Sequence, residues 1–489
     1  MRHSALALAA LAALLALAGC TNLAPDYARP AVPLPAAWPA GSAPAPASAT
    51  PAVADLAVDD FLRDERLRGT VRLALDNNRD LRVAAFNIDR ARAQYGIQRA
   101  ALFPAVSATG AVTRARTAAD TTTTGRSTTT NTFSAGVGFS SWEIDFFNRV
   151  GNLTDAALET YFSTADTQRS TRLALVADTA TAWLTLAADQ RRLQLARDTL
   201  KSQQATYDLT SRAHAVGAES GLTLAQTRAT AESARADVAS YSRAVAQDRN
   251  ALALLVGAQV PDALLPVAPA ANGDPAAPLP EAAALVGVPD GLPSDVLVNR
   301  PDVLAAEHTL RGAFASIGAA RAAFFPRITL TTQAGGASRD LDRLFAGDNR
   351  AWSFAPQIVL PIFTAGQLQA SLDVARITRD INVAQYEKTL QTAFREVADA
   401  LAARATLGEQ LDAQRALLAA DVTAFSLSQS RWRTGVDSYL DVQVNQRALY
   451  TAGQALITLQ LAEQANRITL YKVLGGGWRT AQAGTTASP

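Results

Sequence analysis

Two junctions of nearly the same sequence, RAALFPAVSAT at residues 99–109 and RAAFFPRITLT at residues 321–331, decide the fold of this chain. In each, a run typical of a helix ends at Phe-Pro and a run typical of a strand follows, because proline is costly inside a helix and restricts the residue before it. A junction that recurs about 220 residues later indicates an internal duplication. The chain is therefore expected to contain one structural unit twice.

Prolines mark the divisions within each half. They crowd residues 25–51 and 261–301, whereas none occurs over residues 105–260 or 362–488. Proline-free stretches rich in Ala, Leu, Gln and Arg favour long helices. The first proline cluster predicts an extended N-terminal segment, and the second predicts a linker between the two halves.

Alternating residues predict two strands in each half. In the first half, apolar Phe133, Val137 and Phe139 alternate with small Gly136 and Gly138, which is typical of a strand with one apolar face. The glycines in this GVGFSS stretch are strand residues and not a phosphate loop or a nucleophile elbow.

In the second half, WSFAPQIVLPIF at residues 352–363 predicts a strand. The side chains expected on one face are Phe354, Ile358, Leu360 and Ile362. Pro356 favours an edge position or a weakly paired end, because proline cannot donate to a sheet.

Two β-hairpins are therefore expected, at residues 103–147 and 325–363. The polar run AADTTTTGRSTTTNT at residues 118–132 is predicted to form the first hairpin tip. It is interpreted as an extracellular loop, either as a contact for a phage or toxin or as a tip without a role of its own.

A long helix is expected after each hairpin, over about residues 150–214 and 366–433. Apolar residues recur every seven positions in both, as in the seam of a coiled coil. The matched positions, 218 residues apart, are Leu193, Leu200 and Tyr207 in the first helix and Leu411, Leu418 and Phe425 in the second. At 1.5 Å per residue each helix is about 100 Å long.

Each long helix is predicted to end in a turn, AVGAES at residues 215–220 and RTGVDS at residues 433–438. The glycine in each turn suits a left-handed position after a helix, and the serine suits the N-cap of a returning helix. These residues are Gly217, Gly435, Ser220 and Ser438, and Ser438-x-x-Asp441 has capping-box spacing. The returning helices are expected to end at Gly257 and Gly475.

The predicted domain organisation follows from these elements. The boundaries are 1–19 for an export signal, 20–55 for an extended segment, 56–257 for the first repeat, 258–292 for the linker, 293–475 for the second repeat and 476–489 for a tail.

Composition excludes several classes of function. The 45 Lys and Arg residues balance 44 Asp and Glu, so the basic patch that nucleic acid requires is not expected. Apart from the N-terminus no apolar run is long enough for a membrane helix, so a membrane-spanning part would have to be built of strands. Of the three histidines, His3 lies in the signal and His214 and His308 lie on different predicted helices, without an HExxH motif. We predict no enzyme, cofactor or metal site.

The N-terminus predicts export. MRHSALALAALAALLALAGC has a short positive head and an apolar segment, as in a cleaved signal. It ends in Leu-Ala-Gly-Cys, and Cys20 is the only cysteine of the chain. The pattern resembles a bacterial lipobox, in which Cys20 becomes N-terminal and lipidated, and Thr21 in place of an aspartate favours the outer membrane. The alternative is a small-residue cleavage site next to a chance cysteine.

The number of strands predicts an oligomer. Four strands per chain cannot close a barrel, and open sheet edges are not tolerated in lipid. Three chains would supply twelve strands, an even number like that of bacterial barrels.

Five further stretches occur in a fixed order along the chain. They are PDYARPAVPLPAAW at 25–38, NRPDV at 299–303, LPIFTAG at 360–366, RWRTGVDSYLDV at 431–442 and LYKVLGGGW at 470–478. With these stretches the chain resembles the outer membrane factor family, in its NodT-type lipoprotein branch.

The resemblance implies an α+β membrane protein. It implies a homotrimeric tube in which a twelve-stranded outer-membrane β-barrel, four strands per chain, continues into a long periplasmic α-helical barrel built from the two repeats. It further implies that the channel serves a tripartite exporter, with a periplasmic adaptor and an inner-membrane pump, usually of the resistance-nodulation-division type, as partners besides the lipids of the outer membrane.

The resemblance also implies a gate at the periplasmic end. Leu440 and Asp441 match family constriction positions, Val444 stands where a second aspartate is usual, and Thr223 is the counterpart of Asp441 in the first repeat. Residues three and four apart share a helix face. We therefore expect an apolar choke of Leu440 and Val444 beside one ring of Asp441, closed partly by dewetting.

Trp432 and Arg433 are expected to tie neighbouring helices at this gate. The alternative for Asp441 is that it only completes the cap of Ser438. The tip residues expected to contact an adaptor are Gly217, Ala218, Glu219, Ser220, Gly435, Val436, Asp437 and Ser438.

Two other functions are kept open. A lipid-anchored coiled-coil spacer that does not conduct would explain the heptads but not the alternating strands. The outer channel of a type I protein exporter would share the whole architecture.

Overall fold

The structure is a computed structural model that describes residues 21–31, 34–35, 38, 53, 56–271, 274, 276–284 and 294–477. The predicted signal at 1–19, Cys20 and the end of the tail at 478–489 lie outside the described residues. The chain divides into two units. The first comprises residues 1–31, 87–165 and 305–387, and the second comprises residues 32–86, 166–304 and 388–489.

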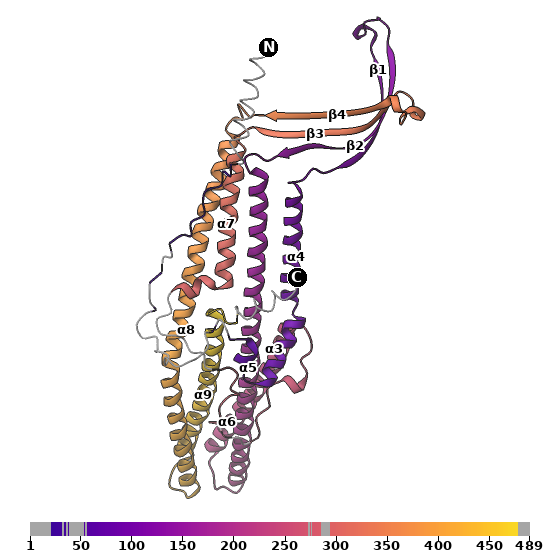
Figure 1. The fold of residues 1–489 in the computed structure, drawn as a ribbon. Helices are drawn as coiled ribbons and strands as arrows, with labels where there is room; N and C mark the ends of the chain where they lie inside the picture. Colours follow the sequence, from indigo (N-terminus) through magenta and orange to yellow (C-terminus); the bar gives the residue numbers. More distant parts are fainter. Residues whose placement is uncertain are drawn as a thin grey trace. The chain divides into compact units, whose positions relative to one another are not determined.

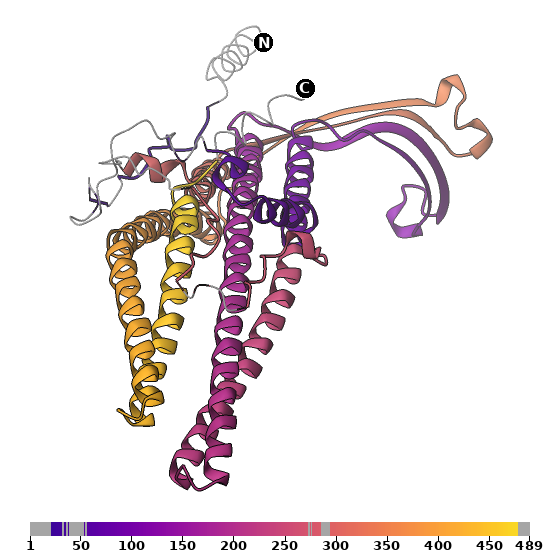
Figure 2. The same ribbon diagram turned by 90° about the horizontal axis from the view of Figure 1, so that it is seen from below.

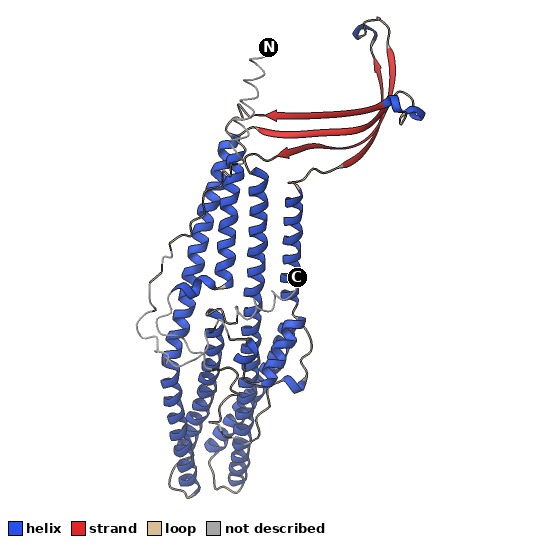
Figure 3. Ribbon diagram, in the orientation of Figure 1, coloured by secondary structure: helices blue, strands red, loops and turns tan. Residues whose placement is uncertain are grey.

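The first unit contains a four-stranded antiparallel sheet in the order β1-β2-β3-β4 (Figures 1 and 3). The strands are β1 Ser107–Thr117, β2 Thr128–Ile144, β3 Arg327–Ser338 and β4 Arg350–Val359. The β2–β3 pairing joins the two halves of the chain, with Gly136 opposite Gly335. A Cβ atom at Gly335 would lie 2.0 Å from the Ala135 carbonyl oxygen, so the close approach of these strands requires glycine.

The expected features of the strands are partly confirmed. Pro356 lies in β4, an end strand of the sheet, as predicted. The strand ends at Val359, however, so the prediction that Leu360 and Ile362 continue its apolar face is wrong. The reason is Pro361, which disfavours further pairing. The first hairpin tip is also shorter than predicted, because residues 128–132 already pair with β1.

Each hairpin is preceded by a 22-residue helix and followed by a 67-residue helix. The short ones are α4 Arg79–Ala100 and α7 Pro301–Ala322, and the long ones are α5 Arg149–Ala215 and α8 Gln367–Arg433. The long helices agree with the predicted ones to within one residue at each end. Among the described residues, no helix combines the length and the apolar character that a membrane span requires.

The returning helices are α6 Gly221–Val256 and α9 Tyr439–Val473, and both belong to the second unit. Gly257 and Gly475 follow them with φ angles of 73° and 72°, as expected for glycines that end helices. The shorter helices are α2 Val58–Phe61 and α3 Glu65–Asn77. In the described part of the chain, 3-10 turns lie at Ala119–Thr121, Asp262–Leu264, Ser294–Asn299, Leu341–Arg343 and Gly347–Asn349.

The similar segments LDNNRD at residues 75–80 and LVNRPD at residues 297–302, one in each repeat, use different chemistry to hold the ends of the returning helices. Asn78 donates from Nδ2 to the Leu255 carbonyl oxygen at 2.7 Å, near the end of α6. Its counterpart Arg300 donates to the Val473 carbonyl oxygen at 2.9 Å, at the end of α9. Both contacts satisfy carbonyl groups that a helix end leaves without a partner.

The core of the second unit is built where the linker meets the helices. Trp183 of α5 is buried and donates from its indole nitrogen to the Leu264 carbonyl oxygen at 2.9 Å. Phe61 stacks on Tyr471 with ring centroids 4.0 Å apart. Linker residue Leu279 is buried in a cluster with residues of α5 and α9, so the described part of the linker packs as a structural element.

Candidate functional site at the helix tips

Two helical hairpins, α5 with α6 and α8 with α9, end in the tip turns (Figure 2). Gly217 and Gly435 adopt φ angles of 77° and 75°, as predicted for the turn glycines. In the first tip, Ser220 Oγ accepts a hydrogen bond from the Thr223 backbone N–H at 3.1 Å, the predicted N-cap. His214 Nδ1 lies 2.8 Å from the Glu219 carbonyl oxygen and closes this turn.

The second tip is closed by an ion pair that the sequence analysis missed. Arg431 donates from Nε and from its terminal nitrogen to the two oxygens of Asp437, at 2.5 and 2.8 Å. These hydrogen bonds hold the pKa of Asp437 below its usual value. Asp437, one of the residues expected at an adaptor contact, is thus already engaged with Arg431 in the single chain.

The cap of α9 differs from the predicted capping box. Ser438 Oγ donates to the Asp441 carboxylate at 2.7 Å, and it does not accept a backbone N–H. The serine hydroxyl is oriented by the carboxylate instead, which leaves the first turn of α9 with a weaker backbone cap than α6. The predicted side-chain cap by Ser438, with Asp441 completing a capping box, is therefore wrong, whereas the predicted cap by Ser220 is confirmed.

The predicted gate residues lie in the first two turns of α9. Leu440 and Val444 are 57% and 59% exposed within one chain, and Asp441 is exposed between them. Tyr439, by contrast, is buried and its ring lies 5.3 Å from that of Trp432.

The other predicted tip residues are placed as follows. Thr223, the counterpart of Asp441, is half-buried in the first turn of α6, and Arg433 is exposed. Gly217, Ala218 and Val436 are exposed, whereas Glu219 is half-buried. Trp432 thus packs onto the return helix of its own hairpin.

A polar stripe on α9 joins the two repeats above the tips. Its residues, four apart on one face, are Tyr450, Gln454 and Thr458. Tyr450 donates to Asp237 at 3.1 Å and Gln454 donates to the Tyr241 hydroxyl at 3.0 Å, both on α6. Burial and the Asp237 charge raise the pKa of Tyr450, so its hydroxyl stays protonated as a donor.

Arg192 of α5 connects this stripe to a pair of carboxyl groups. It donates to Thr458 at 2.9 Å and to Asp189 at 2.5 Å. Asp248 of α6 lies beside Asp189, and its Oδ2 is buried without a donor among the described residues. Burial and the Asp189 carboxylate, opposed by Arg192, raise the pKa of Asp248 to about 6.

Sequence reasoning missed this stripe because its members are ordinary polar residues of long helices. The only available signal was their four-residue spacing in α9.

The two helical histidines have separate partners, His214 in the first tip and His308 at 2.6 Å from Glu159 on α5. No group of three His, Cys, Asp or Glu residues in the described chain is arranged to hold a metal ion.

Comparison with known proteins identifies the family. The model of the outer membrane efflux protein family matches residues 70–258 and 292–476, the two repeats with their helices and hairpins. The chain belongs to the outer membrane efflux protein family. Members of this family are transport components of the outer membrane, so this efflux protein is an outer membrane protein.

Similar curated proteins span its whole length. The toluene efflux pump outer membrane protein TtgC of Pseudomonas putida is 49% identical over 492 residues, which cover 100% of this chain and 99% of the relative. The outer membrane protein OprJ of Pseudomonas aeruginosa is 40% identical over 478 residues, covering 98% and 97%.

A solved structure shares its fold. The open state of the MtrE outer membrane channel of Neisseria gonorrhoeae superposes with a TM-score of 0.82 at 34% identity, covering 94% of the efflux protein and 98% of MtrE. The recognition of the family and of the α+β fold from the sequence is thus confirmed.

Proposed function

We propose that this efflux protein forms, as a homotrimer, the outer channel of a tripartite pump that exports small molecules. The observation that supports this most directly is its open sheet. Within the described strands, β1 and β4 each pair on one side only. An unpaired edge cannot remain in lipid, and three copies joined edge to edge would give a closed barrel of twelve strands.

The exposure of the strands supports the same assembly. Apolar side chains on the sheet are open to solvent in the single chain, among them Trp352 at 80% and Ile358 at 67%. Exposed apolar surface of this kind indicates contact with lipid or with another subunit. A non-conducting spacer would not require it.

The gate proposal is built on α9. Three copies of Leu440 and Val444 would form an apolar constriction beside a ring of Asp441, with Trp432 and Arg433 near the ends of the outgoing helices. The exposure of Leu440 and Val444 supports this, because apolar side chains facing water in one chain are available to meet their symmetry copies. Asp441 accepts a hydrogen bond from Ser438 and is still exposed, so this contact does not compete with the proposed gate role.

The remaining assignments complete the proposal. Cys20 would carry the lipid anchor, the two tips would contact a periplasmic adaptor, and an inner-membrane pump of the resistance-nodulation-division type would deliver the substrate. The relatives named as parts of toluene and antibiotic pumps support an efflux role over protein export. No catalytic role is proposed.

The experiment that tests the assembly uses purified protein in detergent. We expect a mass of three chains by light scattering, and ion conductance when the same fraction is added to a planar bilayer. A monomer that conducts would refute the proposal, since four strands cannot enclose a pore.

A further inference from the structure

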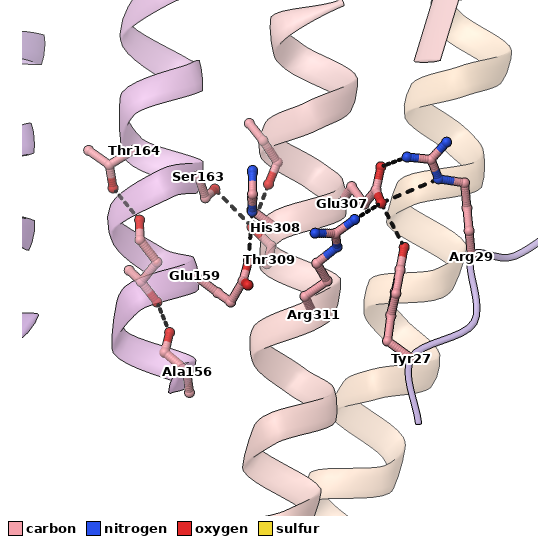
Figure 4. A network of polar contacts seen from close by, with 12 residues as sticks. Tyr27, Arg29, Ala156, Glu159, Ser163, Thr164, Glu307, His308, Thr309 and Arg311 are labelled. Carbon is pink, nitrogen blue, oxygen red and sulfur yellow. Dashed lines mark hydrogen bonds and ion pairs between the residues drawn. The ribbon is translucent and has the colours of Figure 1, made fainter. Parts of the chain in front are cut away.

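An extended segment near the N-terminus contacts α7, and Figure 4 shows its Tyr27 and Arg29 side chains pointing toward Glu307 of that helix. We call residues 21–31 the strap. The strap contacts α7 residues spaced three and four apart, which therefore form one stripe on the helix. These residues, the α7 stripe, are Glu307, Arg311, Phe314, Gly318 and Arg321. The strap and the stripe belong to the same unit.

The first end of the strap is fixed through its backbone. Thr21 donates its backbone N–H to the Phe146 carbonyl oxygen at 3.2 Å, two residues after β2 ends and three before α5 begins. Arg321 donates to the Leu23 carbonyl oxygen at 3.1 Å. Both contacts use backbone groups of the strap. They therefore fix the position of its backbone and do not select particular strap side chains.

The middle of the strap fits the stripe by shape. A Cβ atom at Gly318 would lie 2.7 Å from the Ala24 backbone nitrogen, so glycine lets the strap approach α7 closely. The Tyr27 ring meets Phe314 edge-on at 5.5 Å, and Arg311 lies 4.9 Å from its centre.

The second end is fixed through charge at Glu307, which is 2% exposed. Its carboxylate accepts hydrogen bonds from Arg29 at 2.7 Å, from Arg311 at 2.6 Å and from the Tyr27 hydroxyl at 3.1 Å. Burial alone would raise the pKa of Glu307, but the hydrogen bonds and charges of the two arginines outweigh it and hold the pKa below its usual value. A buried carboxylate with these partners is an ionised acceptor that two strap side chains help to satisfy.

The length of the strap agrees with the length of the α7 stripe. From Leu23 to Arg29 the strap advances six residues, about 20 Å for an extended chain. From Arg321 to Glu307 the helix advances fourteen residues, about 21 Å. The strap is therefore fully extended and antiparallel to α7, and a shift by one residue would remove Arg29 from Glu307.

The adjacent face of α7 is held by α5. Glu159 lies 2.6 Å from His308, and Ser163 lies 3.0 Å from Thr309 (Figure 4). Because α5 supports α7 independently, loss of the strap is expected to leave the helix in place.

We propose that the α7 stripe is a docking site for the strap of the same chain, and that Glu307 sets its register. Docking holds the start of the strap at the junction of β2 and α5, whether or not the N-terminus is acylated. The place on the fold from which a lipid anchor at Cys20 would extend is then set by these protein contacts. This consequence rests on the proposed anchor, whereas docking itself does not.

Chymotrypsin tests the proposal on purified protein that carries Cys20→Ala and so lacks acylation. Tyr27 precedes alanine, whereas the next aromatic residue, Trp38, precedes a proline that blocks cleavage. In the docked strap the bond after Tyr27 is expected to be protected. Glu307→Gln should speed this cut about tenfold or more. The loss of the charged hydrogen bonds should raise the population of the undocked strap by about a factor of ten, and cleavage follows that population.

Two further variants make the outcome decisive. Arg29→Ala changes only the strap and should speed the cut similarly even if Glu307→Gln fails to fold, and Glu232→Gln on an exposed face of α6 should have no effect. Helical circular dichroism should stay unchanged for Arg29→Ala. Equal cleavage rates in wild type and Arg29→Ala, or rapid cleavage of the unacylated parent, would overturn the proposal. A protein that protects Tyr27 but does not conduct would instead refute the channel and leave docking intact.

Discussion

Replacing Asp248 by asparagine should remove a pH dependence from the stability of this protein. Asp248 and Asp189 face each other across α6 and α5, and Arg192 is the cation beside them. Asparagine keeps the shape and can donate to the Asp189 carboxylate. It therefore replaces a repulsive contact by a hydrogen bond without creating a cavity.

The size of the effect follows from the pKa. A rise from 3.8 to about 6 corresponds to about 3 kcal/mol at 1.36 kcal/mol per unit. Asp248 is only half-buried, so solvent screening reduces this to about 1 to 2 kcal/mol. Because the folded pKa is raised, the stabilising contribution is complete below about pH 4 and is lost as the pH rises through 6.

The measurement is the free energy of unfolding in detergent, followed by circular dichroism in denaturant at pH 4 and pH 7.5. From pH 4 to pH 7.5 the free energy of unfolding of the wild type should fall by about 1 to 2 kcal/mol more than that of Asp248→Asn. The variant should therefore be the more stable protein at pH 7.5. Asp76→Asn, at an exposed position of α3, is the control and should keep the wild-type slope. The proposed repulsion between Asp248 and Asp189 would be refuted if Asp248→Asn kept the wild-type pH dependence of stability, or if it were less stable than wild type at pH 7.5.

Three further predictions concern the gate, the anchor and the α9 end. In planar bilayers, Leu440→Ala with Val444→Ala should raise conductance more than Asp441→Ala does; the opposite ranking would contradict an apolar gate. Labelling with a radioactive fatty acid should mark wild type and not Cys20→Ala, and the variant should still form trimers; its failure to do so would give the anchor a role in assembly. Arg300→Met should lower the free energy of unfolding by about 2 kcal/mol, because it removes the hydrogen bonds of the buried guanidinium to the Val473 carbonyl oxygen and to the half-buried carboxylates of Asp302 and Glu396; a loss below about 1 kcal/mol, measured in denaturant, would show that these three contacts contribute little.

Local features of the fold were available from the sequence. The absence of proline over residues 150–214 predicted α5, and the glycines at 217 and 435 predicted turns that reverse the chain. Each of these signals depends on a few neighbouring residues, through backbone sterics or a period of two or seven. Pro361 is the local signal that β4 ends early, and it outweighs the apolar alternation around it.

The candidate gate illustrates the limit of such reasoning. Leu440 and Val444 could be assigned to one helix face from their spacing, and their exposure agrees with that. The ion pair of Arg431 with Asp437 could not be anticipated, because either residue alone is a common surface residue. Whether a charged side chain in a turn reaches its neighbour depends on the exact path of the turn.

The sequence by itself determined the duplication, the elements and their lengths, since these follow from local backbone preferences and short periods. Only the tertiary structure decided which polar residues meet. Tyr450 reaches Asp237 across 213 residues, and Arg29 reaches Glu307 across 278. Such pairs are fixed by how extended segments and helices pack side by side, and a hydrogen bond requires its atoms to lie within about 3 Å. No local pattern in the chain specifies a distance of that kind between segments so far apart.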